Sequence, residues 1–298
     1  MTGFIVFDKP ENMTSFLAVN KLRKAIGEKK AGHSGTLDPM ATGVLFVAVG
    51  GATRFMEFIP QRDKSYIAGL KLGIATDTLD ITGNILNEIK TQIDYDAAKK
   101  AAESFKGKIM QIPPMYSALK KDGVRLYDLA RKGIEVERQE RQVEIYKIEI
   151  VGFDYENQEF SIEVDCSSGT YIRTLAEDIG KKLGVPAVLT SLRRTKANGF
   201  GENECYSLDE IKEAVEKSRI EEMLLPVDRV MGSYPEVFVS PAQAVRFSNG
   251  GELFLDRIKS KMTDGIYRVY SPDKSFLGLG LCDMEKNSLF VKRVYNEI

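Results

Sequence analysis

The chain has 298 residues and a formal net charge of −1 at pH 7, with 43% hydrophobic and 29% charged residues. This length exceeds what one hydrophobic core usually supports, so we expect one large and one small domain. The composition is typical of a soluble globular protein, and no apolar run approaches the roughly 20 residues of a membrane-spanning helix. The first residues, MTGFIVFDKPENM, lack the basic start of a signal peptide, so the expected location is cytoplasmic.

Basic residues are unevenly distributed, although the net charge is close to zero. Residues 21–30 hold five Lys or Arg and one Glu, and residues 106–141 hold nine basic and five acidic side chains. Either segment can be an ordinary solvated surface. Together they can also form a surface for a polyanion such as nucleic acid, and both interpretations stay open here.

Residues 3–10 predict a β-strand, and residues 14–27 predict a helix. Thr14 or Ser15 can cap the start of this helix, and Gly27 ends it. One face of the helix is apolar, through Phe16, Val19, Leu22 and Ile26.

The segment AGHSGTLDPMATGVLFVAVGG, residues 31–51, leads from a glycine-containing loop into an apolar strand. Gly32 and Gly35 give the loop backbone freedom, and Pro39 favours an extended conformation at Asp38. The Asp38 carboxylate is therefore held on a shaped loop. It is either a catalytic carboxylate or a turn residue that accepts hydrogen bonds from nearby backbone N–H groups.

The middle of the chain predicts a mixture of strands and helices. A strand is expected at 65–73, and short helices ending in glycine are expected at 94–107 and 126–133. Residues 142–154 and 158–169 alternate apolar and polar side chains around a turn, which is typical of a long antiparallel hairpin.

A further helix is predicted over 170–184, with one apolar face formed by Ile172, Leu175, Ala176, Ile179 and Leu183. Arg173 lies off this face in the first turn, where the helix dipole disfavours a cation. This exception indicates an anionic partner. The candidates are a phosphate, the Asp38 carboxylate, or ordinary surface pairing with Glu177 or Asp178.

The pattern changes after a capping box at Ser207 and Glu210 and the segment PVDRVMGSYP, residues 226–235. Short strands separated by turns follow, with one helical stretch at 241–253, and they predict a small β-barrel of about 60 residues. The preceding part predicts a mixed α/β or α+β domain with a largely antiparallel sheet, without regular βαβ winding.

Two tyrosines and the single histidine are candidate site residues. Tyr66 and Tyr171 lie near basic residues, so they can stack on an unpaired base or pack in the core. His33 cannot form a metal site by itself, and no motif supports pairing it with Cys166 or Ser34 as a nucleophile.

No cofactor or metal motif is found. The three cysteines are far apart, which argues against a disulfide framework and a cysteine zinc site. The stretch DTLDITGN, residues 77–84, has Leu at the third position of a calcium loop and lacks the ligating Glu at the twelfth. We expect neither a metal nor a cofactor.

Several stretches resemble, in order, the bacterial tRNA pseudouridine synthases of the TruB family: DKPENMTS, GHSGTLDPMATGVL, KSYIAGLKLG, IPPMYSALKKDGVRLYDLARKG, GTYIRTLAEDIG and LRRT. The resemblance covers residues 4 to about 195, and the C-terminal part resembles the PUA domain that follows in this family. One departure is Asn12, where the family usually has glycine. Asparagine tolerates a left-handed backbone conformation better than most residues.

The resemblance implies an enzyme that isomerises uridine 55 in the T loop of tRNA to pseudouridine without a cofactor. It implies that Asp38 is the catalytic carboxylate, that Tyr66 stacks on the target uracil, and that Arg173 pairs with Asp38. Four further positions match residues that contact or support the bound RNA: His33, which inserts into the T loop, Tyr171 and Leu192 in the pocket, and Lys9 under the first turn.

The resemblance also implies a catalytic domain over residues 1–230, with a thumb-like basic insertion at about 106–141, and a PUA-like RNA-binding domain over 234–298. It implies that the target base is flipped out of its stack. The expected enzyme acts alone, without a protein partner, and as a monomer. The alternative is a non-catalytic RNA-binding or RNA-folding protein that uses the same surface, and an accessory tRNA-folding role fits either case.

Overall fold

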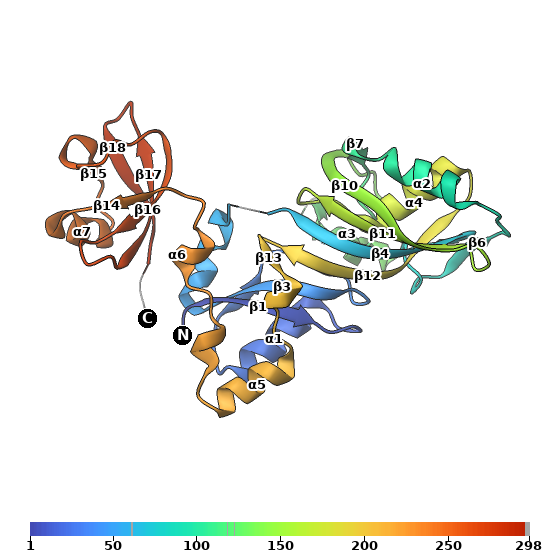
Figure 1. The fold of residues 1–298 in the computed structure, drawn as a ribbon, viewed down its shortest axis with the longest axis horizontal. Coiled ribbons are helices and arrows are strands. Elements are labelled where there is room, and N and C mark those ends of the chain that lie inside the picture. Colours follow the sequence, from blue (N-terminus) through green and yellow to red (C-terminus); the bar gives the residue numbers. More distant parts are fainter. Residues whose placement is uncertain (61, 118, 122, 296–298) are drawn as a thin grey trace.

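The computed structural model describes residues 1–60, 62–117, 119–121 and 123–295. Its largest sheet has the strand order β1-β3-β12-β4-β11-β10-β7, with β2 beside β3 and β13 beside β12 (Figure 1). These strands are β1 (Gly3–Lys9), β2 (Ala31–His33), β3 (Thr42–Val49), β4 (Lys64–Leu72), β7 (Gly107–Gln111), β10 (Arg141–Asp154), β11 (Glu159–Cys166), β12 (Ala187–Ala197) and β13 (Phe200–Gly201).

The sheet is largely antiparallel, as expected, and β12 joins its two halves. β12 pairs in parallel with β3, where Arg194 lies opposite Gly43, and antiparallel with β4, where Arg194 lies opposite Tyr66. Gly43 has a φ of 95°, and a Cβ built there would lie 2.3 Å from the Arg194 carbonyl oxygen. The junction therefore needs glycine at position 43.

Helices cover the sheet in two groups (Figure 1). In one group, α2 (Tyr95–Glu103) and α4 (Ile172–Leu183) pack on the half of the sheet that contains β10 and β11. In the other, α1 (Ser15–Ala25) and α5 (Leu208–Glu216) pack beside β1 and β3. The Thr14 hydroxyl caps α1, and Ser207 and Glu210 form the expected capping box of α5.

Shorter elements complete the large part of the molecule. They are the 3₁₀ helices η1 (Gly50–Phe58), η2 (Glu202–Glu204) and η3 (Ile220–Met223), the helices α3 (Leu126–Ala130) and α6 (Val227–Val230), and the paired strands β5 (Ile74–Thr76) with β6 (Ile85–Glu88) and β8 (Lys120–Lys121) with β9 (Val124–Arg125). The expected insertion at 106–141 therefore contains β7, β8, β9 and α3. Its residues Ala118 and Asp122 lie outside the described residues.

The C-terminal part is a separate five-stranded half-barrel with the strand order β14-β16-β17-β18-β15 (Figure 1). Its elements are β14 (Glu236–Phe238), α7 (Pro241–Ser248), β15 (Leu253–Phe254), the 3₁₀ helix η4 (Leu255–Arg257), β16 (Gly265–Tyr270), β17 (Phe276–Asp283) and β18 (Ser288–Val294). This confirms the small β-structure expected at the C-terminus, of which residues 296–298 lie outside the described part.

The half-barrel has its own core, and it also packs on the large part of the molecule. Phe276 of β17 and Tyr295 lie 6.2 Å and 6.1 Å, between ring centroids, from Phe55 of η1. The Tyr234 hydroxyl donates to the Phe58 carbonyl at 2.8 Å. Within the part of the chain that the structure describes, no helix is long and apolar enough to cross a membrane.

Candidate active site

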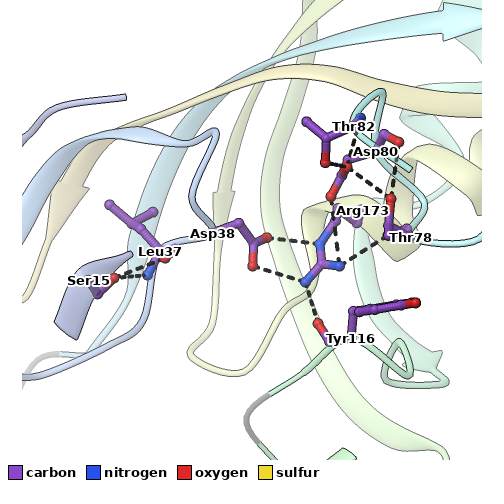
Figure 2. A network of polar contacts seen from close by, with 8 residues as sticks. All are labelled: Ser15, Leu37, Asp38, Thr78, Asp80, Thr82, Tyr116 and Arg173. Carbon is purple, nitrogen blue, oxygen red and sulfur yellow. Dashed lines mark hydrogen bonds and ion pairs between the residues drawn. The ribbon is translucent and has the colours of Figure 1, made fainter. Parts of the chain in front are cut away.

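Asp38 lies on the loop of residues 34–41, between β2 and β3, which we call the Asp38 loop (Figure 2). The Ser15 hydroxyl, at the start of α1, donates to the Leu37 carbonyl at 2.9 Å and accepts from the Leu37 N–H at 2.8 Å. The turn after Asp38 is closed by its backbone carbonyl, which accepts from the Ala41 N–H at 3.1 Å. The carboxylate is therefore left for another partner, which argues against the turn interpretation.

That partner is Arg173, in the first turn of α4 (Figure 2). Its Nε lies 2.8 Å from one Asp38 carboxylate oxygen, and its Nη2 lies 3.0 Å from the other. The Arg173 side chain is 5% exposed and the Asp38 side chain is 30% exposed. Glu177 and Asp178 pair with Lys181 instead, so the surface pairing considered for Arg173 is not formed.

Arg173 is held in place by groups from two further segments. Its Nη1 donates to the Thr78 carbonyl at 3.0 Å, and its Nη2 donates to the Tyr116 carbonyl at 2.8 Å. A second carboxylate, that of Asp80, lies 4.0 Å from Nη1. Because the guanidinium is bonded along three directions, it presents a fixed edge to Asp38.

Asp80 is a site residue that the sequence analysis missed. It is 5% exposed, and its carboxylate accepts from the Thr82 hydroxyl at 2.6 Å and the Thr78 hydroxyl at 2.9 Å. It lies in the stretch DTLDITGN, which was assessed only as a calcium loop. The available signal was an aspartate between two threonines, which can bond locally, but its proximity to Arg173 is a tertiary contact.

The environment of Asp38 acts on its protonation in opposite directions. Burial raises the pKa of the Asp38 carboxyl above its ordinary range, Arg173 opposes this, and the negative charge of Asp80 adds to it. Such competition between desolvation and a charge partner is typical of carboxylates that carry out chemistry. Asp38 can act as a nucleophile or as a base.

Tyr66 lies on β4, opposite Arg194 of β12, and is 6% exposed. Burial raises the pKa of its phenol to about 12, although the positive charge of Arg194 opposes this shift. Leu192, two residues before Arg194, is 7% exposed and belongs to the same apolar cluster as Tyr66 and Leu37. The structure therefore brings Tyr66, Leu192 and the Asp38 loop together.

Tyr171 directly precedes α4 and is fixed by Gln111 of β7. The Tyr171 N–H donates to the Gln111 side-chain oxygen at 3.0 Å, and the Gln111 side-chain amide donates to the Tyr171 carbonyl at 3.2 Å. Burial raises the pKa of the Tyr171 phenol, and the charges of both Asp38 and Arg173 influence it. Tyr171 therefore lies close to the ion pair.

Lys9, at the end of β1, is 0% exposed and lies under the site. Its ammonium donates to the carbonyls of Met13 at 2.6 Å, Pro10 at 2.8 Å and Pro39 at 3.3 Å. Burial lowers the pKa of Lys9 to about 8, although the Asp38 charge opposes this shift. Lys9 thus fastens the turn at 10–13 to the Asp38 loop.

His33 lies at the end of β2, in the lining of a pocket of about 490 Å³ that also includes Arg54, Arg62 and Arg293. Burial and the charge of Arg194 lower the pKa of His33, which favours its neutral imidazole. Asp38 does not line this pocket. In the described ranges, no group of three or more His, Cys, Asp or Glu residues is arranged to hold a metal ion.

Family models match the chain in three consecutive parts. The TruB family pseudouridylate synthase N-terminal domain matches residues 23–172, and the tRNA pseudouridylate synthase B C-terminal domain matches residues 173–231. The C-terminal domain of pseudouridine synthase II TruB matches residues 235–294. Together the matches span the ion pair and the half-barrel.

Individual relatives agree with this assignment. The tRNA pseudouridine synthase B of Clostridium tetani is 44% identical over 94% of this chain and 95% of its own length, and that of Azoarcus sp. is 42% identical over 98% and 94%. Among solved structures, a Cbf5-Nop10-Gar1 complex contains a chain with a TM-score of 0.75 and 25% identity, covering 98% of this chain and 84% of that one. The present chain therefore belongs to the TruB family of pseudouridylate synthases and is an isomerase.

Proposed function

We infer that this enzyme converts uridine 55 in the T loop of tRNA to pseudouridine, with Asp38 as the catalytic carboxylate. The observation that carries the assignment is the ion pair of Asp38 and Arg173, in which the cation is buried and the carboxylate remains 30% exposed. Relatives named tRNA pseudouridine synthase B support tRNA as the substrate. The motif GHSGTLDPMATG around Asp38 supports the specific position.

The reaction needs one reactive carboxylate and no redox partner. The N1–C1′ bond of the uridine breaks, the uracil rotates, and a C5–C1′ bond forms. The proton on C5 is lost and N1 gains one, so the product is an isomer of the substrate. Asp38 assists either by attacking as a nucleophile or by accepting a proton, and the Arg173 guanidinium stabilises its charged form.

The neighbouring residues suit a flipped uracil. The Tyr66 ring offers a face on which the uracil can stack. Leu192 and Tyr171 add apolar surface around the detached base and so keep water away from it. Flipping costs a few kcal/mol of stacking energy. Insertion of His33 into the T loop offsets this cost, and the neutral state of its imidazole favours stacking over ion pairing. Lys9 keeps the Asp38 loop in place from below.

The enzyme acts as a monomer without a protein partner, and it contacts tRNA through the segment 106–141 and the C-terminal half-barrel. Support for this comes from the composition of that segment, in which nine basic side chains outnumber five acidic ones. The same contacts give the protein a means to assist tRNA folding, as a second role beside catalysis.

The test is an incubation of the purified protein with an unmodified tRNA transcript, followed by mapping of pseudouridine at single-nucleotide resolution. We expect modification at position 55 alone, without added metal, nucleotide or protein. A second transcript with cytidine at position 55 controls for other sites. Tight tRNA binding with no pseudouridine formed would favour the non-catalytic RNA-binding alternative.

A further inference from the structure

Arg194 of β12 is a buried charge for which the proposed reaction has no assigned use. The residue is 1% exposed, and it is among the largest fully buried side chains of the described residues. Within the described ranges its guanidinium forms no ion pair with a carboxylate, and its Nη1 is buried without a hydrogen-bond partner. Burying a charge in this way is costly, and an apolar residue of similar volume usually serves the fold as well.

Arg194 forms two side-chain hydrogen bonds and one cross-strand pairing, and together they connect three parts of the site. Its Nε donates to the Val44 carbonyl on β3 at 2.7 Å, and its Nη2 donates to the Gly35 carbonyl on the Asp38 loop at 3.2 Å. Its backbone lies directly opposite Tyr66 of β4 in the sheet, and its positive charge opposes the rise in the pKa of the Tyr66 phenol. A Cβ built on Gly35 would lie 3.7 Å from Nη1, so loop and guanidinium are in close approach.

These contacts hold two groups whose relative position the proposed reaction requires. Tyr66 is the stacking surface of the proposed site, and the Asp38 loop carries the carboxylate. Because Arg194 is bonded to the Asp38 loop through Gly35 and is paired with Tyr66 across β12 and β4, a shift of its guanidinium moves the loop relative to Tyr66. Displacements of about 1 Å in such supporting groups lower reaction rates strongly.

We propose that Arg194 is a positioning residue of the pseudouridine synthase site, which holds the Tyr66 ring and the Asp38 loop at a fixed separation. The proposal rests on the proposed function of Asp38 and Tyr66. In this proposal Arg194 does not touch the substrate, because its side chain is only 1% exposed. It acts on the rate through their geometry, and it has little part in the affinity for tRNA.

The neighbouring residue provides a matched control. Arg193 directly precedes Arg194 in β12, so its side chain points to the opposite face of the sheet, and it forms ion pairs with Asp8 and Glu202. It contacts neither Tyr66 nor the Asp38 loop in any interaction that the structure records among its described residues. Replacing Arg193 therefore removes a guanidinium from β12, with a loss of stability, and leaves the two site groups in place.

The experiment compares Arg194→Met and Arg194→Lys with Arg193→Met and Arg193→Lys in the full-length protein. Three quantities are measured: the melting temperature, the dissociation constant for unmodified tRNA, and the single-turnover rate of pseudouridine formation at saturating enzyme. For Arg194→Met we expect a rate at least 30-fold below wild type and a dissociation constant within threefold. For Arg193→Met we expect both within threefold.

Arg194→Lys keeps a cation at this position, and its reaction rate tests the proposal if Arg194→Met does not fold. A single ammonium cannot replace the separate bonds of Nε to the Val44 carbonyl and of Nη2 to the Gly35 carbonyl, so we expect an intermediate rate, about tenfold below wild type. Arg193→Lys should leave the rate unchanged. A wild-type rate in Arg194→Lys would overturn the proposal, and so would equal loss of rate in the Arg193 variants. Absence of pseudouridine with the wild-type protein would instead refute the proposed function.

Discussion

At the scale of single residues, Asp80 is expected to shift the acid limit of the reaction to higher pH. Its negative charge raises the pKa of Asp38, so Asp80→Asn should lower that pKa. If ionised Asp38 is the active form, the rate falls as pH drops through this pKa. The acid limb of the single-turnover rate against pH should therefore move to lower pH in Asp80→Asn, whose amide oxygen still accepts from Thr78 and Thr82.

The control for this shift is Asp77→Asn. Asp77 lies in the same turn, but its carboxylate accepts from the backbone and side chain of Asn84. We expect its profile to match that of the wild type. A shift of the acid limb to higher pH in Asp80→Asn, or equal shifts in both variants, would contradict the assigned influence of Asp80.

Arg173→Lys tests the bidentate geometry of the ion pair. A lysine ammonium cannot bond both Asp38 oxygens and the carbonyls of Thr78 and Tyr116 at once, since its donors radiate from one atom. We expect the single-turnover rate to fall at least tenfold while the circular dichroism spectrum stays that of the wild type. A rate within twofold of wild type would mean that only the charge at this position matters.

At the scale of elements, the sequence predicted best where structure is local. The structure agrees with the predictions of α1 and its cap at Thr14, of the helix that carries Arg173, and of the β10–β11 hairpin. The signals for these elements, namely capping, apolar spacing and alternation, lie within each segment. The strand β12 was not predicted. Its pairing with β4 shifts register at Leu189/Ser191 and Arg194/Lys196, which breaks the alternation that identifies a strand.

The same limit applies to the site. The resemblance placed Asp38, Tyr66 and Arg173 by their motifs, and the structure joins the first and last in an ion pair. The parts played by Asp80 and Arg194 depend on contacts between residues far apart in the chain. A polar side chain such as Arg194 also appears exposed in a sequence pattern, although it is 1% exposed in the folded protein.

The basic segment 106–141 is expected to contact phosphates of the T stem-loop. If it does, replacing Lys121 and Arg131, which lie at exposed positions, with Gln should flatten the dependence of log affinity on log salt. The expected change is about 0.7 to 0.9 per lost contact. Filter binding at four salt concentrations measures it. As the control, Lys212→Gln on α5 and Lys217→Gln directly after it remove cations already paired with Asp209 and Glu213. Equal slopes in all variants would mean that the segment is merely solvated.

At the scale of the whole molecule, the half-barrel is expected to serve binding more than chemistry. Every residue assigned to the reaction precedes β13, whereas the half-barrel starts at β14. Deleting residues from Ser233 onward should therefore weaken tRNA affinity and leave the saturated single-turnover rate within threefold. It should also lower the melting temperature, because Phe55 loses its contacts with Phe276 and Tyr295. Unchanged affinity in a folded truncated protein would contradict this division.

We expect the Asp38 carboxylate to carry out chemistry and not to be needed for folding or tRNA binding. The variant Asp38→Asn separates these roles. The asparagine keeps one acceptor oxygen for Arg173, which also retains its bonds to Thr78 and Tyr116 and its proximity to Asp80. The turn after position 38 is closed by backbone atoms and is unaffected. The variant should therefore fold.

The decisive measurement is single-turnover pseudouridine formation by Asp38→Asn on unmodified tRNA, alongside its melting curve and its dissociation constant for the same tRNA. We predict a folded protein that binds within about tenfold of wild type, equivalent to about 1.4 kcal/mol, and forms no detectable pseudouridine at position 55. A folded Asp38→Asn protein that forms pseudouridine at a rate near that of the wild type would contradict the assignment of Asp38 as the catalytic carboxylate.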